Sequence, residues 1–314
     1  MNKTPLTPAK AERLRKISNP AGGIAAVAMD QRSSLRRMIA AAAGKPENSI
    51  ADVTLTEFKS AVTSVLTPHA SAVLLDPEYG LDATREKSPA CGLLLTYEAD
   101  GFENPRPNRM LLLMSRFSVQ RLKDLGADAI KILLSWNPEA DGPANDEKRV
   151  WIERIGNECH ALDIPFLLEP VTYDVEARRK PESVVRTLEE FSKPVYKVDV
   201  LKIEFPVIAG SPNFTQDEVL HWYRAADAAA QVPYVFLSAG ITIDQFVGSL
   251  ELAAEAGAHF SGVLCGRATW QDGVHSFVSG GRKAFEAWLA GDGVKNLLRI
   301  EQCLRAASSW EQRR

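Results

Sequence analysis

Eight short apolar runs alternate with longer amphipathic segments along almost the whole chain, and this alternation constrains the fold more than any other feature. The strand-like runs are Gly23–Asp30, Ser71–Asp76, Cys91–Tyr97, Ala129–Ser135, Pro165–Glu169, Val200–Glu204, Tyr234–Ala239 and Gly262–Gly266. The helix-like segments between them include Thr54–Thr67, Asp146–Leu162, Pro181–Phe191, Gln216–Ala230 and Ile243–Ala256. Apolar strands that follow one another through helices are typical of parallel βαβ units, in which both faces of the sheet are covered.

Eight such units in a chain of 314 residues match the size of a closed (β/α)8 barrel. We therefore predict an α/β fold, a (β/α)8 TIM barrel, with residues 1–314 forming a single domain, because no Pro-, Gly- or Ser-rich linker divides the chain. A doubly wound open sheet is the alternative. It would favour a glycine-rich loop after the first strand, where this sequence has Asp30-Gln31-Arg32-Ser33.

Charge and composition argue against several classes of partner. A formal net charge of -3 offers no basic footprint for nucleic acid and no attraction to an anionic membrane. The apolar runs fall short of the roughly 18–20 residues that cross a bilayer, and the polar first residues give no sign of a signal peptide. The cysteines, at 91, 159, 265 and 303, form no CxxC pair and are expected to be reduced thiols. We therefore expect a cytoplasmic protein that binds neither nucleic acid nor membrane.

Two lysines and a glutamate interrupt three consecutive strand-like runs. They are Lys131, Glu169 and Lys202, in the fourth, fifth and sixth runs. Burying an ammonium group costs several kcal/mol unless the group is paired or its pKa shifts. One explanation is a structural ion-pair network. The other is an enzyme that forms a Schiff base, since desolvation and a neighbouring cation such as Lys131 lower the pKa of an amine and make Lys202 nucleophilic.

The strand ends predict where these groups meet. In (β/α)8 barrels the chemistry sits at the carboxyl ends of the strands, so side chains from the fourth, fifth and sixth strands should converge on one patch of the barrel mouth. The seventh run ends in Ser238-Ala239-Gly240 and the eighth in Gly266-Arg267. Glycine lets the backbone approach a phosphate closely and arginine adds a fork of donors, so these two loops are candidates for a phosphate site. The alternative is that both glycines serve only in turns.

Histidine placement argues against a metal site. The five histidines (His69, His160, His221, His259 and His275) all fall in expected helices or loops, away from strand ends, and no HxxH or HxxxH spacing occurs. A zinc-dependent barrel would need imidazoles at its mouth. We therefore expect a reaction without metal or cofactor.

Several long blocks of the sequence resemble one enzyme family. The blocks are AMDQR (28–32), LLDPEYG (74–80), CGLLLTYE (91–98), GADAIKILL (126–134), IPFLLEPVTYD (164–174), VDVLKIEFPV (198–207), PYVFLSAG (233–240) and GVLCGRATW (262–270). Together they resemble the class I tagatose 1,6-bisphosphate aldolases, over a span from about residue 17 to the SSWEQRR tail. The resemblance implies a (β/α)8 barrel and metal-free cleavage of a ketohexose bisphosphate into dihydroxyacetone phosphate and glyceraldehyde 3-phosphate.

The same resemblance assigns roles to individual residues. It places the Schiff-base lysine on Lys202, the catalytic glutamate on Glu169, the second active-site lysine on Lys131 and the aspartate of the DQR motif on Asp30. The residues expected to bind the substrate and its phosphates are Gln31, Arg32, Ser238, Gly240, Gly266 and Arg267. A small-molecule sugar phosphate is the expected ligand, and a homo-oligomer, dimer or tetramer, the expected assembly.

Other functions remain open at this point. The related sulfofructose 1-phosphate aldolases share the DQR, LLD, Lys-x-Glu and GRA-Trp elements. Ser33, where the tagatose enzymes tend to carry glycine, and a shorter loop at Ile208–Thr215 lie near the expected far end of the sugar, so its C6 substituent and its C4 stereochemistry stay undecided. A transaldolase-like transfer of dihydroxyacetone and a non-catalytic sugar-phosphate-binding regulator are further alternatives. The sequence also leaves open how Glu169 and Asp30 divide the proton transfers.

Overall fold

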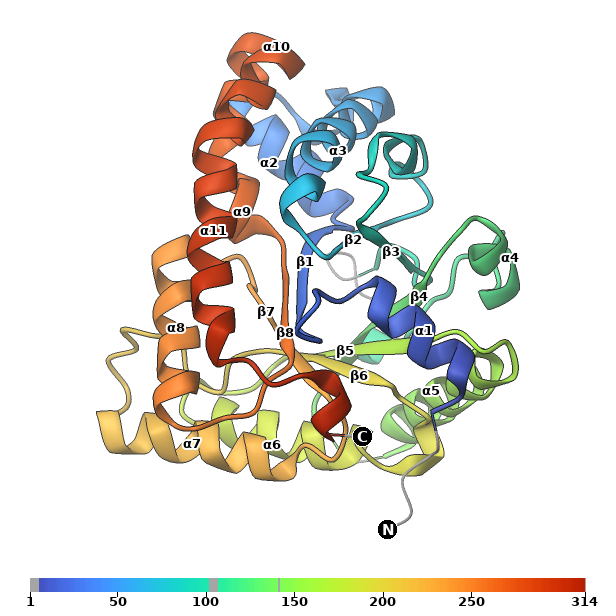
Figure 1. Cartoon of the computed structure of the whole chain (residues 1–314), viewed down its shortest axis with the longest axis vertical. Helices are drawn as coiled ribbons and strands as arrows, with labels where there is room; N and C mark the ends of the chain where they lie inside the picture. The colour runs from blue at the N-terminus through green and yellow to red at the C-terminus, as the bar shows by residue number, and fades with distance from the viewer. Residues whose placement is uncertain (1–5, 102–106, 141, 314) are drawn as a thin grey trace.

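Eight parallel strands close into a barrel in the computed structural model, which describes residues 6–101, 107–140 and 142–313 (Figure 1). Each strand pairs with the next along the chain, and β8 returns to pair with β1. The strands are β1 (Ile24–Met29), β2 (Ala72–Leu75), β3 (Gly92–Thr96), β4 (Ala129–Trp136), β5 (Phe166–Thr172), β6 (Val200–Ile203), β7 (Tyr234–Leu237) and β8 (Gly262–Cys265). The prediction of a (β/α)8 barrel is confirmed.

Helices surround the barrel on the outside (Figure 1). Within the described residues they are α1 (Pro8–Lys16), α2 (Ser33–Ala43), α3 (Asp52–Leu66), α4 (Val119–Asp124), α5 (Pro143–Ala161), α6 (Lys180–Phe191), α7 (Gln216–Ala229), α8 (Ile243–Glu255), α9 (Arg267–Trp270), α10 (Val274–Trp288) and α11 (Val294–Cys303). The α10 helix packs against α2 and α3, and α11 packs against α8. Figure 1 shows α10 and α11 along one side of the barrel.

Most element boundaries fall within three residues of the expected ones, and β5 differs in a way that matters for the site. It was expected to end at Glu169, but its pairing with β4 continues to the Trp136–Thr172 pair. Glu169 therefore lies in the middle of a strand, paired with Leu133 of β4 and one residue beyond the last pair of β5 with β6.

The barrel interior changes from apolar to charged between one side-chain layer and the next. Alternate residues of a strand point into the barrel. The apolar layer of the interior includes Ala129 of β4, Leu167 of β5 and Val200 of β6. Two residues further along the same strands come Lys131, Glu169 and Lys202. Charged groups thus sit directly above an apolar floor, which explains how a lysine comes to occupy an otherwise apolar strand.

Helix α1 and the C-terminal segment close the opposite end of the barrel. Leu14, Ile17 and Trp310 are buried in the same apolar cluster as the interior of the strands. Arg15 pairs with Glu311 at 2.9 Å, so the two segments lie side by side. The buried ammonium group of Lys10 lies 2.6 Å from Asp199, next to β6. The floor of the barrel is therefore packed and tied by ion pairs.

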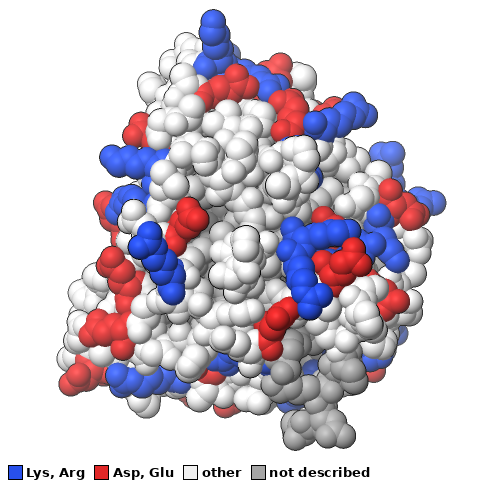
Figure 2. Space-filling view, viewed as in Figure 1, with Lys and Arg blue, Asp and Glu red and all other residues white. Residues whose placement is uncertain are grey.

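The outer surface carries charges of both signs. On the face seen in Figure 2, basic and acidic side chains lie interspersed around broad uncharged areas, as the small net charge suggests. None of the helices in the described part of the chain is long and apolar enough to span a bilayer.

Candidate active site

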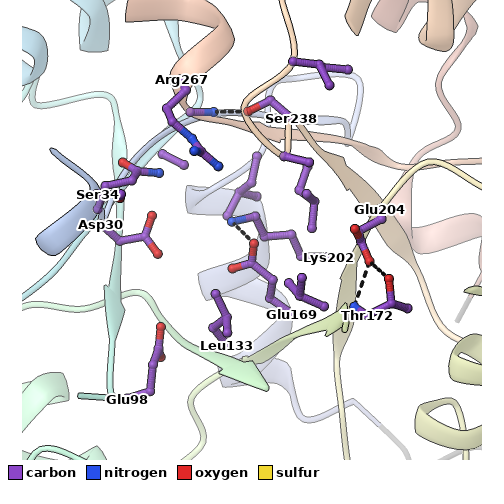
Figure 3. A pocket seen from close by; sticks show the side chains of 18 of the residues that line it. Asp30, Ser34, Glu98, Leu133, Glu169, Thr172, Lys202, Glu204, Ser238 and Arg267 are labelled. Atoms are coloured by element: carbon purple, nitrogen blue, oxygen red, sulfur yellow. Dashed lines mark hydrogen bonds and ion pairs between the residues drawn. The ribbon is translucent and has the colours of Figure 1, made fainter. Parts of the chain in front are cut away.

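A cavity of about 410 Å³ opens at the carboxyl ends of the strands (Figure 3). Of the residues singled out from the sequence, those that line it are Asp30, Gln31, Arg32, Glu169, Lys202, Ser238, Gly266 and Arg267. In Figure 3, Lys202 and Glu169 point toward each other near the centre, with Ser238 and Arg267 on one side and Thr172 and Glu204 on another. This volume is within the usual range for a small-molecule site.

Lys131 lies next to this cavity without lining it, and three carboxylates surround its ammonium group. Its Nζ lies 2.8 Å from Asp30, 2.7 Å from Glu98 and 2.7 Å from Glu169. The side chain is fully buried. Its N–H groups donate to Asp30 and Glu98, and its contact with Oε2 of Glu169 is an ion pair. Lys131 is therefore engaged by carboxylates of the protein rather than directed into the cavity, which the sequence did not reveal.

Charge coupling fixes the ionisation of this cluster. Burial alone disfavours the charged form of Lys131, but the carboxylates of Asp30, Glu169 and Glu98 outweigh it and raise the pKa of Lys131 well above its ordinary value. Burial likewise disfavours ionised Asp30, but the charges of Lys131 and Lys202 lower the pKa of Asp30 far below its usual range. Both groups are therefore charged at neutral pH.

Lys202 differs from Lys131 in its partners. Its Nζ forms an ion pair with one carboxylate, the Oε1 atom of Glu169 at 2.8 Å. The other oxygen of Glu169 faces Lys131. Glu169 thus bridges the two lysines, and of the two only Lys202 lines the cavity. Of the two lysines, Lys202 is therefore the one whose amine is placed to meet a ligand, with a carboxylate directly beside it.

Backbone geometry brings the loops after β7 and β8 together. Ala239 and Gly240 both have positive φ, 47° and 80°, in a tight turn closed by the Ile241 N–H to Ser238 O bond of 2.9 Å. A Cβ on residue 240 would lie 2.7 Å from Cζ of Arg267. The positive φ of residue 240 favours glycine, and a side chain there would also displace the guanidinium that packs on it. Ser238 also accepts the Gly266 N–H at 3.3 Å, as Figure 3 shows.

Arg267 is the cation of this corner. It is partly exposed, it lines the cavity, and no carboxylate among the described residues forms an ion pair with it. Gly266 leaves space for the side chain of Gln31, because a Cβ at residue 266 would lie 2.9 Å from the Gln31 amide nitrogen. The amide oxygen of Gln31 is buried and has no hydrogen-bond partner within the described structure. Gln31 and Arg267 therefore offer polar groups to a ligand.

Arg32 has a more structural setting than the sequence suggested. Only 7% of it is exposed, and its Nη1 donates to Glu78 at 2.9 Å and to the Glu98 carbonyl at 3.0 Å. The guanidinium thus ties together the loops after β1, β2 and β3. The backbone N–H and the hydroxyl of the next residue, Ser33, both donate to Asp100, which also lines the cavity.

Sequence reasoning missed three acidic residues of the cavity, Asp100 and two others that contact lysines. Glu98, just after β3, contacts Lys131, and its other oxygen is buried without a hydrogen-bond partner among the described groups. Its place at a strand end was the available signal. Glu204, two residues after Lys202, accepts from the Thr172 N–H and hydroxyl and from Lys180 at 2.7 Å. Alternation along β6 places it on the same side as Lys202.

Across the described ranges, no cluster of three or more His, Cys, Asp or Glu side chains is arranged to hold a metal ion. The carboxylates that do gather, at Asp30, Glu98 and Glu169, converge on the Lys131 ammonium group instead. A reaction without metal or cofactor stays a prediction.

Comparison with known proteins places this geometry in a family. Residues 24–272 match the family described as DeoC/LacD family aldolase. A protein of Enterococcus faecalis named tagatose 1,6-diphosphate aldolase 2 is 42% identical over 97% of this chain and 96% of its own length. Proteins named tagatose 1,6-diphosphate aldolase from Listeria monocytogenes and Streptococcus pneumoniae are each 39% identical, covering 97% and 98% of this chain and 94% and 99% of their own lengths. The chain is a member of the DeoC/LacD family of aldolases.

Proposed function

We propose that this aldolase cleaves tagatose 1,6-bisphosphate into dihydroxyacetone phosphate and glyceraldehyde 3-phosphate through a Schiff base on Lys202. The observation that carries the proposal is the cavity-lining Lys202–Glu169 pair beside the Ser238 and Arg267 loops. The names of the full-length relatives support the same substrate and do not favour a sulfonated one.

The reaction follows from the positions of Lys202 and Glu169. Lys202 gives its proton to Glu169 and attacks C2 of the ketose as a neutral amine. The C2 oxygen takes one proton from the attacking nitrogen and one from Glu169 and leaves as water, so that an iminium replaces the ketone and Glu169 is again a carboxylate. Glu169 then accepts the proton of the C4 hydroxyl while the electron pair of the C3–C4 bond moves into the iminium, which releases the aldehyde. Protonation of the enamine at C3 and hydrolysis of the iminium release dihydroxyacetone phosphate and restore Lys202.

Lys131 acts in this scheme as a fixed positive charge. Its three carboxylate partners hold its proton, so it is a poor nucleophile, and its ion pair with Oε2 holds Glu169 in place beside Lys202. Asp30 remains ionised because of the same lysine. A carboxylate with so low a pKa is a weak proton acceptor, so Asp30 accepts hydrogen bonds from sugar hydroxyls and Glu169 carries the protons.

Arg267 holds the C1 phosphate, together with groups of the Ser238–Gly240 turn. We expect Arg267→Ala to lower kcat/KM by about 10–100-fold, since a charge-assisted hydrogen bond contributes about 1.5–3 kcal/mol. The loss should be similar for every ketose that carries a C1 phosphate. Steady-state kinetics with fructose 1-phosphate, tagatose 1,6-bisphosphate and fructose 1,6-bisphosphate measures this loss of kcat/KM. Arg32→Ala is the comparison, because Arg32 lines the cavity next to Ser33, at the end expected to hold C6, so that its loss should change the preference between C6 substituents instead. The reverse pattern would mean that the substrate lies the other way round.

The substrate itself is tested by steady-state comparison of tagatose 1,6-bisphosphate, fructose 1,6-bisphosphate and sulfofructose 1-phosphate on one preparation. We expect the highest kcat/KM with tagatose 1,6-bisphosphate. A phosphate dianion and a sulfonate monoanion differ in charge and in hydrogen-bonding capacity, so a site matched to one disfavours the other. A preference for sulfofructose 1-phosphate would refute the substrate and leave the Schiff-base chemistry intact.

A further inference from the structure

A fully buried lysine outside the cavity supports the segment that carries Asp30. Lys59 lies in α3, behind the barrel wall, and none of its side chain is exposed. Its Nζ donates to the carbonyl of Met29 at 2.7 Å and to the carbonyl of Gln31 at 2.7 Å. It also lies 2.6 Å from Oδ2 of Asp76, whose side chain is fully buried as well. The reaction described above does not use this lysine.

Lys59 donates two hydrogen bonds to backbone carbonyls and forms one ion pair. The carbonyls belong to the residues on either side of Asp30, in the 29–30 and 31–32 peptide groups. Fixing both peptide groups restrains Asp30 and Gln31 between them, and Asp30 points at Lys131, 2.8 Å away. Lys59 thus acts on the active site through the backbone.

The third partner extends the same support to Arg32. Oδ1 of Asp76 accepts the backbone N–H groups of Glu78 at 3.0 Å and Tyr79 at 2.8 Å. The carboxylate of Glu78 in turn binds Arg32. One ammonium group is therefore linked to all three residues of the Asp30–Arg32 segment.

We propose that Lys59 is a positioning residue of the aldolase, which holds Asp30 against Lys131 and Gln31 in the cavity. The proposal rests on the function assigned to Asp30 above. A purely structural lysine is available for comparison at the barrel floor. Lys10 is also buried and pairs with Asp199 at 2.6 Å, but it contacts no backbone carbonyl of the cavity segment.

The experiment compares two charge-balanced double variants. Lys59→Met with Asp76→Asn removes the positioning lysine without leaving a lone buried charge, and the amide introduced at position 76 keeps an oxygen for the N–H groups of residues 78 and 79. Lys10→Met with Asp199→Asn is the matched control. We expect kcat/KM to fall about tenfold or more in the first variant and to stay within about twofold of wild type in the control. Circular dichroism and thermal unfolding establish that both are folded.

A mutant cycle with Asp30→Asn separates positioning from general damage, since residues that act through one another are not additive. In the wild-type background Asp30→Asn should lower kcat/KM, and in the Lys59 variant it should cause little further loss. An equal factor in both backgrounds would overturn the proposal, as would wild-type rates in the folded Lys59 variant.

Lys59→Arg provides a second background should the double variant not fold. It keeps a positive charge near Asp76, but a planar guanidinium cannot direct three contacts from one nitrogen. Asp30→Asn should therefore cause little further loss of kcat/KM in this background as well. If Asp30→Asn is silent in wild type, the positioning proposal fails. The proposed function is tested separately, by covalent trapping at Lys202.

Discussion

Replacing Lys202 by methionine abolishes aldol cleavage, with kcat expected to fall by about 10⁵-fold or more, the scale reached when a covalent nucleophile is removed from an enzyme. Methionine fills the same space in the strand but has no amine to attack the C2 ketone. Borohydride reduction in the presence of dihydroxyacetone phosphate should add one adduct to the wild-type protein, on the peptide that contains Lys202. The variant should gain none.

Lys180→Met is the control for the trapping experiment. Lys180 also lines the cavity, but its ammonium group pairs with Glu204 at 2.7 Å, and its removal should leave the adduct on Lys202 in place. An adduct on Lys131 would reverse the roles of the two strand lysines. Cleavage that persists in Lys202→Met without any adduct would refute the Schiff-base mechanism.

Glu169→Gln should lower kcat by about 10²–10⁴-fold, the usual contribution of a general acid–base group. Glutamine has the same shape but cannot accept and return a proton, and it replaces the carboxylate that bridges Lys131 and Lys202. Because proton transfer belongs to the transition states, KM should change far less than kcat. Steady-state and single-turnover kinetics measure both.

Glu204→Gln serves as the comparison for Glu169. Glu204 lines the same cavity, but Thr172 and Lys180 already occupy its oxygens. We expect a clearly smaller loss of kcat from this substitution. A change in Glu169→Gln confined to KM would mean that Glu169 only binds the substrate, and proton transfer would then have to be assigned elsewhere.

The sequence predicted the barrel from the alternation of apolar runs with amphipathic segments, and the meeting of Lys131, Glu169 and Lys202 from their places on three consecutive strands. A lysine at an interior position is visible as a break in an apolar run, and parallel neighbours bring such breaks together. The carboxylates that surround Lys131 were harder to predict. Glu98 and Asp30 reach it from loops after β3 and β1, and loop conformation has no comparable period.

Arg32 illustrates a second limit. Its sequence position next to Asp30 suggested a residue that binds substrate, and Arg32 does line the cavity, but the loop after β2 also supplies the exposed carboxylate of Glu78 as its partner, which no local pattern indicates. Lys59 is the converse case, since a lysine on an amphipathic helix is normally taken for a solvent-facing residue. The position of Lys59 in the helix was nevertheless informative. Leu55, Phe58 and Val62 mark the buried face of α3, and Lys59 lies on that face. The partners of a buried lysine come from tertiary contacts that no local pattern contains.

The closed floor of the barrel has a consequence for the order of events in turnover. With α1 and Trp310 packed into the lower end, ligands enter and leave through the mouth at the carboxyl ends of the strands. In the mechanism proposed above, the aldehyde half is the first to be freed by bond cleavage, while the other half is still attached to Lys202 as an enamine. Departure is therefore sequential, with glyceraldehyde 3-phosphate first and dihydroxyacetone phosphate second. In the synthetic direction the order inverts, and the enzyme holds the nucleophilic enamine until an aldehyde arrives through the same mouth.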